Sequence, residues 1–360
     1  MKIGILTHYN VSSHGALLQM YGMKRVLEEL GHEVYILIFQ RNMDFIDSDK
    51  QKRFSASRSN LSYYLKNYLI KNGPGMLLYQ VKKQKIMDNF RNQNFSLMPY
   101  VKAGELDAVL IGADEVFALE NGVNFVMFGH GLNCSNIISY APSYGQTDIS
   151  RIDKYACRDL MVSGLKRFSA ISVRDENSQS VVKSLLGKEV PIVCDPALLY
   201  DFRKEIPRGK HDGKYIVVYS YQSNFKEADR IAAIKSYSKK NGCRLYSVGV
   251  YYDWCDKHIN CSPLEMLEVF GNAKAVITDT FHGTISSYIT QSPVAVFVRN
   301  NNNNKLDYLL ECLCLQDRKV SDLSQLEEIL NTKIDYSIPD NNVLELRRFG
   351  MEYLLNALKN

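Results

Sequence analysis

The stretch that decides the fold is IGILTHYNVSSHGALLQMYGMKRVLEELGHEVYILIF, residues 3–39. The apolar run IGILTHY (3–9) is followed by the polar loop NVSSHG and then by a segment with apolar residues at helical spacing. Gly31 ends this predicted helix, and HEVYILIF (32–39) is typical of a second buried strand. Because two strands joined through a helix run parallel, the stretch predicts a parallel sheet with a right-handed crossover.

The same alternation of strand and helix continues along the chain. The stretches LDAVLIGADEVF (106–117), NIISYAPSYG (136–145) and RFSAISVRDENS (167–178) each contain a predicted strand followed by a turn or loop. VPIVCDPALLY (190–200) closes the first half, and Asp195 and Pro196 mark a break in it. A charged linker, residues 201–214, precedes a second set that runs from YIVVYSYQ (215–222) through KAVITD (274–279) to VAVFV (294–298). We therefore predict an α/β protein of two Rossmann-like domains facing a central cleft, the GT-B-type architecture. The expected boundaries are 1–200, 215–340 and a helical tail at 341–360.

Charge is distributed unevenly along the 360 residues, whose net charge is +5. Between Lys50 and Arg91 ten basic residues face one acid, so this part of a helical insertion (about 47–95) carries +9. Inside it, LSYYLKNYLIKN (61–72) has apolar residues at helical spacing between lysines. The insertion is either a solvated segment with a core-packing stripe, or a surface that meets anionic lipid or a pyrophosphate-bearing substrate. It lacks a recognised nucleic-acid motif, so no nucleic acid is expected.

Apolar runs and cysteines indicate the cellular compartment of the protein and whether it binds a metal. The sequence has no apolar run near the ~18 residues that cross a bilayer, and its N-terminus is strand-like. We expect a cytoplasmic protein that is either free or peripheral at the inner face of the membrane. The eight cysteines form no CxxC pair, and no histidine accompanies Cys312 and Cys314, so reduced thiols are expected and a metal site is not.

Three segments carry candidate functional residues at predicted strand ends. His282, in TDTFHGT (278–284), precedes a glycine and a helix N-terminus that would favour an anion. Arg174, in ISVRDENS, could bind carboxylate or phosphate oxygens, and Asp114 and Glu115, in GADEVF, could orient or deprotonate hydroxyls. The structural alternatives are a packed histidine, a surface ion pair and helix caps. The sequence contains no GxGxxG, GxxxxGK[ST] or GxSxG motif.

Six motifs in order resemble one known family over nearly the whole chain. They are NxxxHGALLQMYGMKRVLEELGHEV, DAVLIGADEVF, ISYAPSYG, ISVRDENS, VCDPALL and VITDTFHGTISSYITQSPVAVF. This series is similar to the polysaccharide pyruvyl transferase family. The chain departs from the family pattern at His14, where a tyrosine is common, in GADEVF, where GSDQVW is usual, and before His282, where some members carry an arginine. The last departure leaves part of the donor binding to other residues.

The resemblance implies a transferase that builds a pyruvate ketal on two hydroxyls of a sugar residue, with phosphoenolpyruvate as donor co-substrate and no cofactor. It implies that His282 and Arg174 bind phosphoenolpyruvate, and we extend this donor site to Gly283, Thr284, Arg299 and Lys305. His282 is our choice of acid or phosphate-side partner, because imidazole titrates near neutral pH. Arg174, Asp114 and Glu115 complete the catalytic set, with the two acids as candidate bases. The expected acceptor-binding residues are Asn10, His14, Gly15, Gln19, Tyr140 and Ser143.

The basic insertion leads us to expect an acceptor sugar on a lipid-pyrophosphate-linked oligosaccharide, with membrane contact through Lys50–Arg91, in bacterial surface polysaccharide biosynthesis. Two rivals remain open. One is a GT-B-type glycosyltransferase that uses a nucleotide sugar, because a fold does not determine its chemistry. The other is a non-catalytic glycan-binding or assembly protein, for which replacing His282 or Arg174 by alanine would leave the biological role intact.

Overall fold

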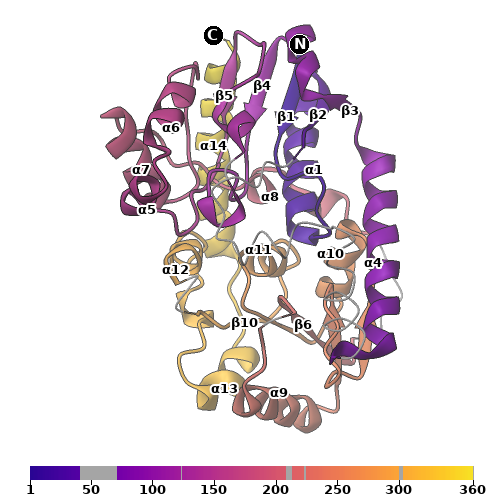
Figure 1. Ribbon diagram of the computed structural model, residues 1–360. Coiled ribbons are helices and arrows are strands. Elements are labelled where there is room, and N and C mark those ends of the chain that lie inside the picture. The colour runs from indigo at the N-terminus through magenta and orange to yellow at the C-terminus, as the bar shows by residue number, and fades with distance from the viewer. Residues whose placement is uncertain (41–70, 123, 208–212, 223, 300–302, 360) are drawn as a thin grey trace.

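In the computed structural model, which describes residues 1–40, 71–122, 124–207, 213–222, 224–299 and 303–359, two α/β domains lie one above the other (Figure 1). Each domain contains a five-stranded sheet, and all pairings between the described strands are parallel. The sheet orders are β3-β2-β1-β4-β5 and β10-β9-β6-β7-β8, so both domains have the same topology. The predicted fold class is confirmed.

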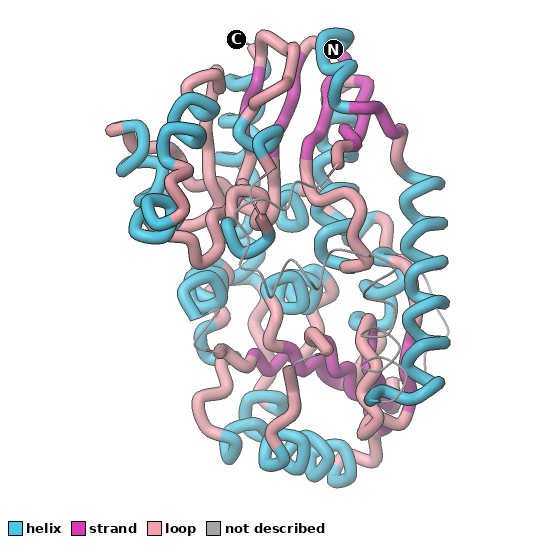
Figure 2. Tube along the Cα trace, viewed as in Figure 1, coloured by secondary structure: helices cyan, strands magenta, loops and turns pink. Residues whose placement is uncertain are grey.

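The strands of the N-terminal domain are β1 (Lys2–Leu6), β2 (Glu33–Ile38), β3 (Leu97–Pro99), β4 (Ala108–Ile111) and β5 (Ile137–Ser139). Those of the C-terminal domain are β6 (Tyr215–Tyr219), β7 (Arg244–Val248), β8 (Lys257–Ile259), β9 (Ala275–Thr278) and β10 (Val294–Val296). The central strands are apolar along their length because helices cover both faces of a parallel sheet. Figure 2 shows this arrangement of magenta strands among cyan helices.

The helices follow the strands in chain order. They are α1 (His14–Glu29), α4 (Lys71–Asn94), α5 (Ile149–Lys154), α6 (Arg158–Leu165), α7 (Glu176–Leu186), α8 (Pro196–Leu199), α9 (Ala228–Lys240), α10 (Pro263–Gly271), α11 (Phe281–Ile289), α12 (Asn303–Cys312), α13 (Leu326–Asn331) and α14 (Ser337–Leu358). Short 3₁₀ turns lie between some of them. One hydrophobic cluster runs from β1 and α1 through α8 to α10 and α11, so the two domains share a core.

The strand predicted within residues 167–178 is wrong. The segments around residues 170–173 and 190–194 are extended but make only isolated bridges, such as Val173 with Ile192. Asp195 and Pro196 then begin the short helix α8, because proline suits the first helical position and Asp195 accepts a hydrogen bond from Ala197 N (2.9 Å). The strands β3 and β8, which the sequence did not predict, have three residues each, too few to show a period.

Two long helices connect the domains. The inner face of α4 is buried, and Tyr79 Oη donates to Ile259 O of the C-terminal domain (3.0 Å). At the other end of the chain, α14 returns to the N-terminal domain, where Tyr353 Oη donates to Ser139 O (2.8 Å). The predicted amphipathic stretch 61–72 lies outside the described residues except for its last two. In the described ranges we find no helix that is both long and apolar enough to cross a membrane.

Candidate active site

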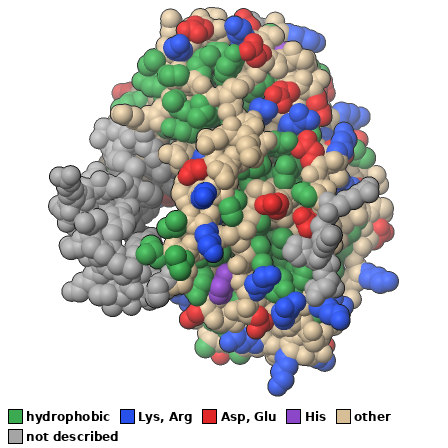
Figure 3. Space-filling view, turned by 90° about the vertical axis from the view of Figure 1, so that its right-hand side faces the viewer, with side chains coloured by type: hydrophobic (Ala, Val, Ile, Leu, Met, Phe, Trp, Pro, Cys, Tyr) green, Lys and Arg blue, Asp and Glu red, His purple; other side chains and the backbone are tan. Residues whose placement is uncertain are grey.

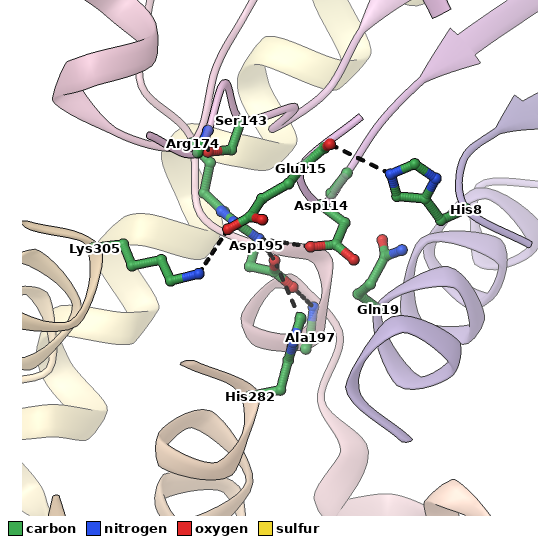
Figure 4. A network of polar contacts seen from close by, with 12 residues as sticks. His8, Gln19, Asp114, Glu115, Ser143, Arg174, Asp195, Ala197, His282 and Lys305 are labelled. Carbon is green, nitrogen blue, oxygen red and sulfur yellow. Dashed lines mark hydrogen bonds and ion pairs between the residues drawn. The ribbon is translucent and has the colours of Figure 1, made fainter. Parts of the chain in front are cut away.

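The candidate site lies between the domains, at the carboxyl ends of the central strands of both sheets. In each sheet the strand order reverses there, between β1 and β4 and between β6 and β9, and open α/β sheets bind ligands at such points. The N-terminal domain contributes residues after β4 and before α7 and α8, and the C-terminal domain contributes α11 and α12. Figure 4 shows that the side chains from both domains point toward one another.

Asp195 is the centre of this cluster, and the sequence analysis did not select it. Its side chain is fully buried, and its Oδ2 atom lies 3.0 Å from Arg174 Nη1 and 3.6 Å from His282 Nε2. Burial alone would raise the pKa of Asp195, but the neighbouring imidazole of His282 and guanidinium of Arg174 lower it to about 2. At neutral pH the group is therefore a carboxylate that connects a residue of each domain.

Arg174 occupies a different place from the one expected of a donor ligand. Its side chain is only 4% exposed, and its guanidinium carbon lies 4.4 Å from the centre of the Phe281 ring. Nη1 also approaches Asp114 Oδ1 (3.8 Å). Burial disfavours the charged form, but the carboxylates of Asp195 and Asp114 outweigh it and raise the pKa of Arg174. In this arrangement the buried guanidinium of Arg174 holds Asp195 in place. A contact between Arg174 and a donor stays a prediction, which the geometry does not favour.

The two candidate bases, Asp114 and Glu115, follow β4 and have different partners. Asp114 has a positive φ of 71°, a conformation that non-glycine residues adopt rarely and often at functional sites. Burial would raise its pKa, but His282, Arg174 and His8 together lower it. Glu115 Oε1 pairs with Lys305 Nζ of α12 (2.6 Å), and the Glu115 carbonyl oxygen lies 3.3 Å from His8 Nε2. The pair between Glu115 and Lys305 is a second ionic contact between the domains.

His282 is positioned by tight packing at the N-terminus of α11. Thr280 caps the helix, accepting a hydrogen bond from Gly283 N (3.0 Å). A Cβ at Gly283 would lie 2.2 Å from Thr278 Oγ1, and a Cβ at Gly15 of α1 would lie 2.3 Å from His282 Cγ and 2.5 Å from its Nδ1. Glycine is thus needed at both positions because side chains approach their backbone closely. The N-termini of α1 and α11 meet at this point.

The remaining predicted donor residues are engaged within the protein. Thr284 Oγ1 donates to Thr280 O (3.0 Å), and Arg299 Nε lies 2.9 Å from Asp279 Oδ2. A site for the negatively charged phosphoenolpyruvate calls for several cations and few acids, whereas Arg174, Arg299 and Lys305 each contact a carboxylate. Positive side-chain charge at this site is therefore largely compensated.

Of the predicted acceptor residues, only Asn10 is exposed. It borders a cavity of about 120 Å³ whose other walls are His8, Tyr9, Val11 and Phe39. The side chains of His14, Gln19, Tyr140 and Ser143 are buried, which is unfavourable for direct contact with a sugar.

His14 illustrates the consequence of such burial. Its Nε2 atom lies 2.9 Å from Cys261 O of the C-terminal domain. Burial, together with the nearby charge of Lys83, lowers the pKa of His14 to about 3. The ring is therefore a neutral element of the domain interface. Within the described ranges we find no cluster of three or more His, Cys, Asp or Glu side chains arranged to hold a metal ion.

Comparisons of structure agree with the fold. The chain is similar to an alpha-glucosyltransferase in complex with UDP and a 13-mer DNA (TM-score 0.52, 10% identity, covering 100% of both chains). It is also similar to the UDP-GlcNAc 2-epimerase from Methanocaldococcus jannaschii (TM-score 0.51, 12% identity, covering 99% of this chain and 100% of the other). At such low identity these likenesses concern the fold alone, which is the GT-B-type pair of Rossmann-like domains.

Comparison of sequence identifies the family. The profile of the polysaccharide pyruvyl transferase family matches residues 14–301, and the chain belongs to this family. General stress protein 30 of Bacillus subtilis (strain 168) is 26% identical over 166 residues, which are 44% of this chain and 47% of that protein. The match thus spans about half the length of this relative.

Proposed function

We propose that the protein transfers the pyruvate unit of phosphoenolpyruvate to two hydroxyls of one sugar residue, forming a cyclic ketal in surface polysaccharide biosynthesis. Membership of the family supports this reaction class. The observation that carries the proposal is the meeting of His282, on α11, with Asp195 and the N-terminus of α1, at the ligand-binding edge of both sheets.

The helix N-termini provide the positive potential that the paired side chains do not. The first turns of α1 and α11, all of whose residues are described, contain no acidic side chain, and the side chain of Ser13 makes no capping hydrogen bond to α1. Backbone N–H groups and the helix dipole make such ends suitable for phosphate or carboxylate. An anionic donor is therefore best placed at His282, at the N-terminus of α11, rather than at Arg174.

The residues present suit the proton transfers of the reaction. The methylene carbon of phosphoenolpyruvate gains a proton, and one sugar hydroxyl attacks the resulting oxocarbenium-like carbon. Phosphate leaves when the second hydroxyl closes the ketal, so one of the two hydroxyl protons ends on the methyl group and the other on phosphate. We assign His282, whose Nε2 faces Asp195, as the acid. Asp114 is our first choice of base, because its lowered pKa keeps it ionised and Glu115 is held by Lys305.

The test is incubation of the purified protein with phosphoenolpyruvate and a panel of lipid-linked glycans. We expect the glycan mass to increase by one pyruvate ketal, with release of one phosphate. His282→Ala should abolish the transfer, whereas His32→Ala, at the turn before β2, should not. Full pyruvate transfer by His282→Ala would overturn the site assignment. Release of nucleotide from a sugar nucleotide, without ketal formation, would favour the glycosyltransferase alternative instead.

The lipid-linked acceptor is part of this proposal and rests on the +9 charge between Lys50 and Arg91. Deleting that whole segment would remove α4, whose buried side chains include Met76, Tyr79, Met87 and Phe90. Loss of activity after such a deletion would therefore report lost packing as much as lost lipid contact. Substitutions confined to the exposed face of α4 avoid this problem.

A further inference from the structure

One face of α4 is apolar, and its side chains are exposed among the described residues. Leu77, Leu78 and Val81 are 43%, 64% and 61% exposed, and the neighbouring side chains of Lys82 and Lys85 are exposed as well. We call these five residues the α4 outer face. Figure 3 views the molecule from the side on which α4 lies and shows apolar side chains beside basic ones there. We propose that the α4 outer face docks on an anionic lipid bilayer.

The exposure of these residues is fixed by the way in which α4 is held. Its opposite face is buried, and three hydrogen bonds attach it to both domains: Tyr79 Oη to Ile259 O (3.0 Å), Lys83 Nζ to Gly249 O (2.7 Å) and Arg91 Nη1 to Val11 O (2.7 Å). Rotating the helix to bury the outer face would break these contacts. Packing within the described part of the protein therefore gives no reason for leucine and valine at 77, 78 and 81.

The chemistry of the face fits a bilayer better than a protein partner. A helix that lies in a lipid interface needs a few apolar side chains and flanking lysines, which reach the phosphates of the headgroups. Asp88 is the single acid in the sequence of α4 and is paired with Arg91, so Lys82 and Lys85 keep their positive charge. A second copy of this chain would set lysine against lysine. The surface of three apolar side chains is also far smaller than the ~800 Å² that each partner buries in a stable protein interface.

The inference rests on the proposed function in one respect, because it explains how a lipid-linked acceptor reaches the site. Arg91 of α4 holds the backbone of the loop that follows β1. In the same loop, His8 contacts the carbonyl of Glu115 at the candidate site. A bilayer against α4 would thus lie beside the loop that leads to the carboxyl edge of the first sheet.

Vesicle co-sedimentation of the 360-residue chain tests the inference without donor or acceptor. We expect binding to phosphatidylcholine vesicles that contain phosphatidylglycerol, little binding to pure phosphatidylcholine, and release by salt. Lys82→Gln/Lys85→Gln should weaken binding by about fivefold per lysine. Leu78→Ser/Val81→Ser should weaken it by about tenfold or more. Leu344→Ser on α14, where Leu344 is 57% exposed, is the matched control and should bind as the wild type does.

The outcomes separate this inference from the proposed reaction. If the wild type ignores anionic vesicles, or if Leu344→Ser weakens binding as much as Leu78→Ser/Val81→Ser, the docking surface is wrong whatever the reaction is. If vesicles bind as expected but no glycan is pyruvylated, the inference stands and the proposed function fails. A change of oligomeric state in Leu78→Ser/Val81→Ser, with unchanged vesicle binding, would identify a protein interface and overturn the inference. Circular dichroism checks that each variant is folded.

Discussion

Replacing Asp195 by Asn tests whether this carboxylate holds the candidate site together. Asparagine has nearly the same shape and retains an oxygen that can accept the hydrogen bond from Ala197 N. The substitution removes the charge that lies 3.0 Å from Arg174 Nη1 and 3.6 Å from His282 Nε2. The buried guanidinium is then left with Asp114 at 3.8 Å as its nearest carboxylate partner within the described residues.

Two estimates give the size of the effect. The pKa of Asp195 falls from its ordinary 3.8 to about 2, and at about 1.4 kcal/mol per pH unit this difference corresponds to roughly 2–3 kcal/mol of stability. Removing one partner of a buried ion pair typically costs about 3–5 kcal/mol. We therefore expect Asp195→Asn to lower the free energy of unfolding by about 3 kcal/mol at pH 7. A carboxyl group with a lowered pKa stabilises the fold above its unfolded pKa, so the difference should shrink as the pH falls from about 4 to 2.

Urea unfolding of the wild type and the variant, followed by circular dichroism across this pH range, measures the difference. Asp148→Asn is the matched control: Asp148 also caps a helix, α5, but its carboxylate is exposed, so we expect a loss of about 1 kcal/mol or less. Adding Arg174→Met to Asp195→Asn should recover part of the loss, because the buried guanidinium that lost its nearest partner is then removed as well. A loss below about 1 kcal/mol for Asp195→Asn, or strict additivity with Arg174→Met, would refute the reasoning.

Three further predictions concern contacts between the domains. Gly15→Ala should force the ring of His282 to move and lower kcat by about 10²-fold. Gly271→Ala is the control and should leave kcat unchanged, because its Cβ would have ordinary contacts starting at 3.6 Å. Equal kcat values for the two variants would contradict the packing argument. Lys305→Met should raise KM for phosphoenolpyruvate. It should change stability by less than about 1 kcal/mol, since the ion pair of Lys305 with Glu115 is partly exposed. An unchanged KM would exclude a contact between Lys305 and the donor. The pKa of His14 is about 3 in the folded state and 6.5 for an ordinary histidine, so the unfolded chain binds one more proton and stability should fall as the pH drops below 6.5. His14→Gln should flatten this pH dependence in acid-unfolding curves, and an unchanged slope would exclude His14 as its cause.

The fold could be predicted because its signals are local. The apolar runs of β1, β4, β6 and β9 are buried on both faces of parallel sheets, so each run is visible without knowledge of its partners. Edge strands such as β8 lack this signal, because three residues show neither a run nor an alternation. The segment around residue 173 was predicted as a strand although it forms none. It is apolar because it is buried, yet Val173 pairs with Ile192 by a single bridge.

The site was predicted only in part, because its geometry depends on contacts between distant residues. His282, Arg174 and Asp114 were recognisable as polar residues directly after apolar runs, and the structure brings them together. Asp195 follows the same rule in VCDPALL, but the proline after it suggested a turn and concealed its other role. Asp195 is in fact both a helix cap and a partner of two residues far from it in sequence. A carboxylate that precedes proline at the end of a buried run could have been selected on that ground.

The space around His282 constrains where a donor can bind. On the side of Arg174, Asp195 and Phe281 the structure has a small cavity of about 30 Å³. On the other side the ring packs directly against Gly15 of α1, where an added Cβ would lie 2.3 Å from His282 Cγ. Because the guanidinium of Arg174 is buried against Asp195, Arg174→Lys should act mainly through Asp195, lowering stability and kcat while leaving KM for phosphoenolpyruvate nearly unchanged. A large increase in KM with normal stability would instead show that Arg174 contacts the donor.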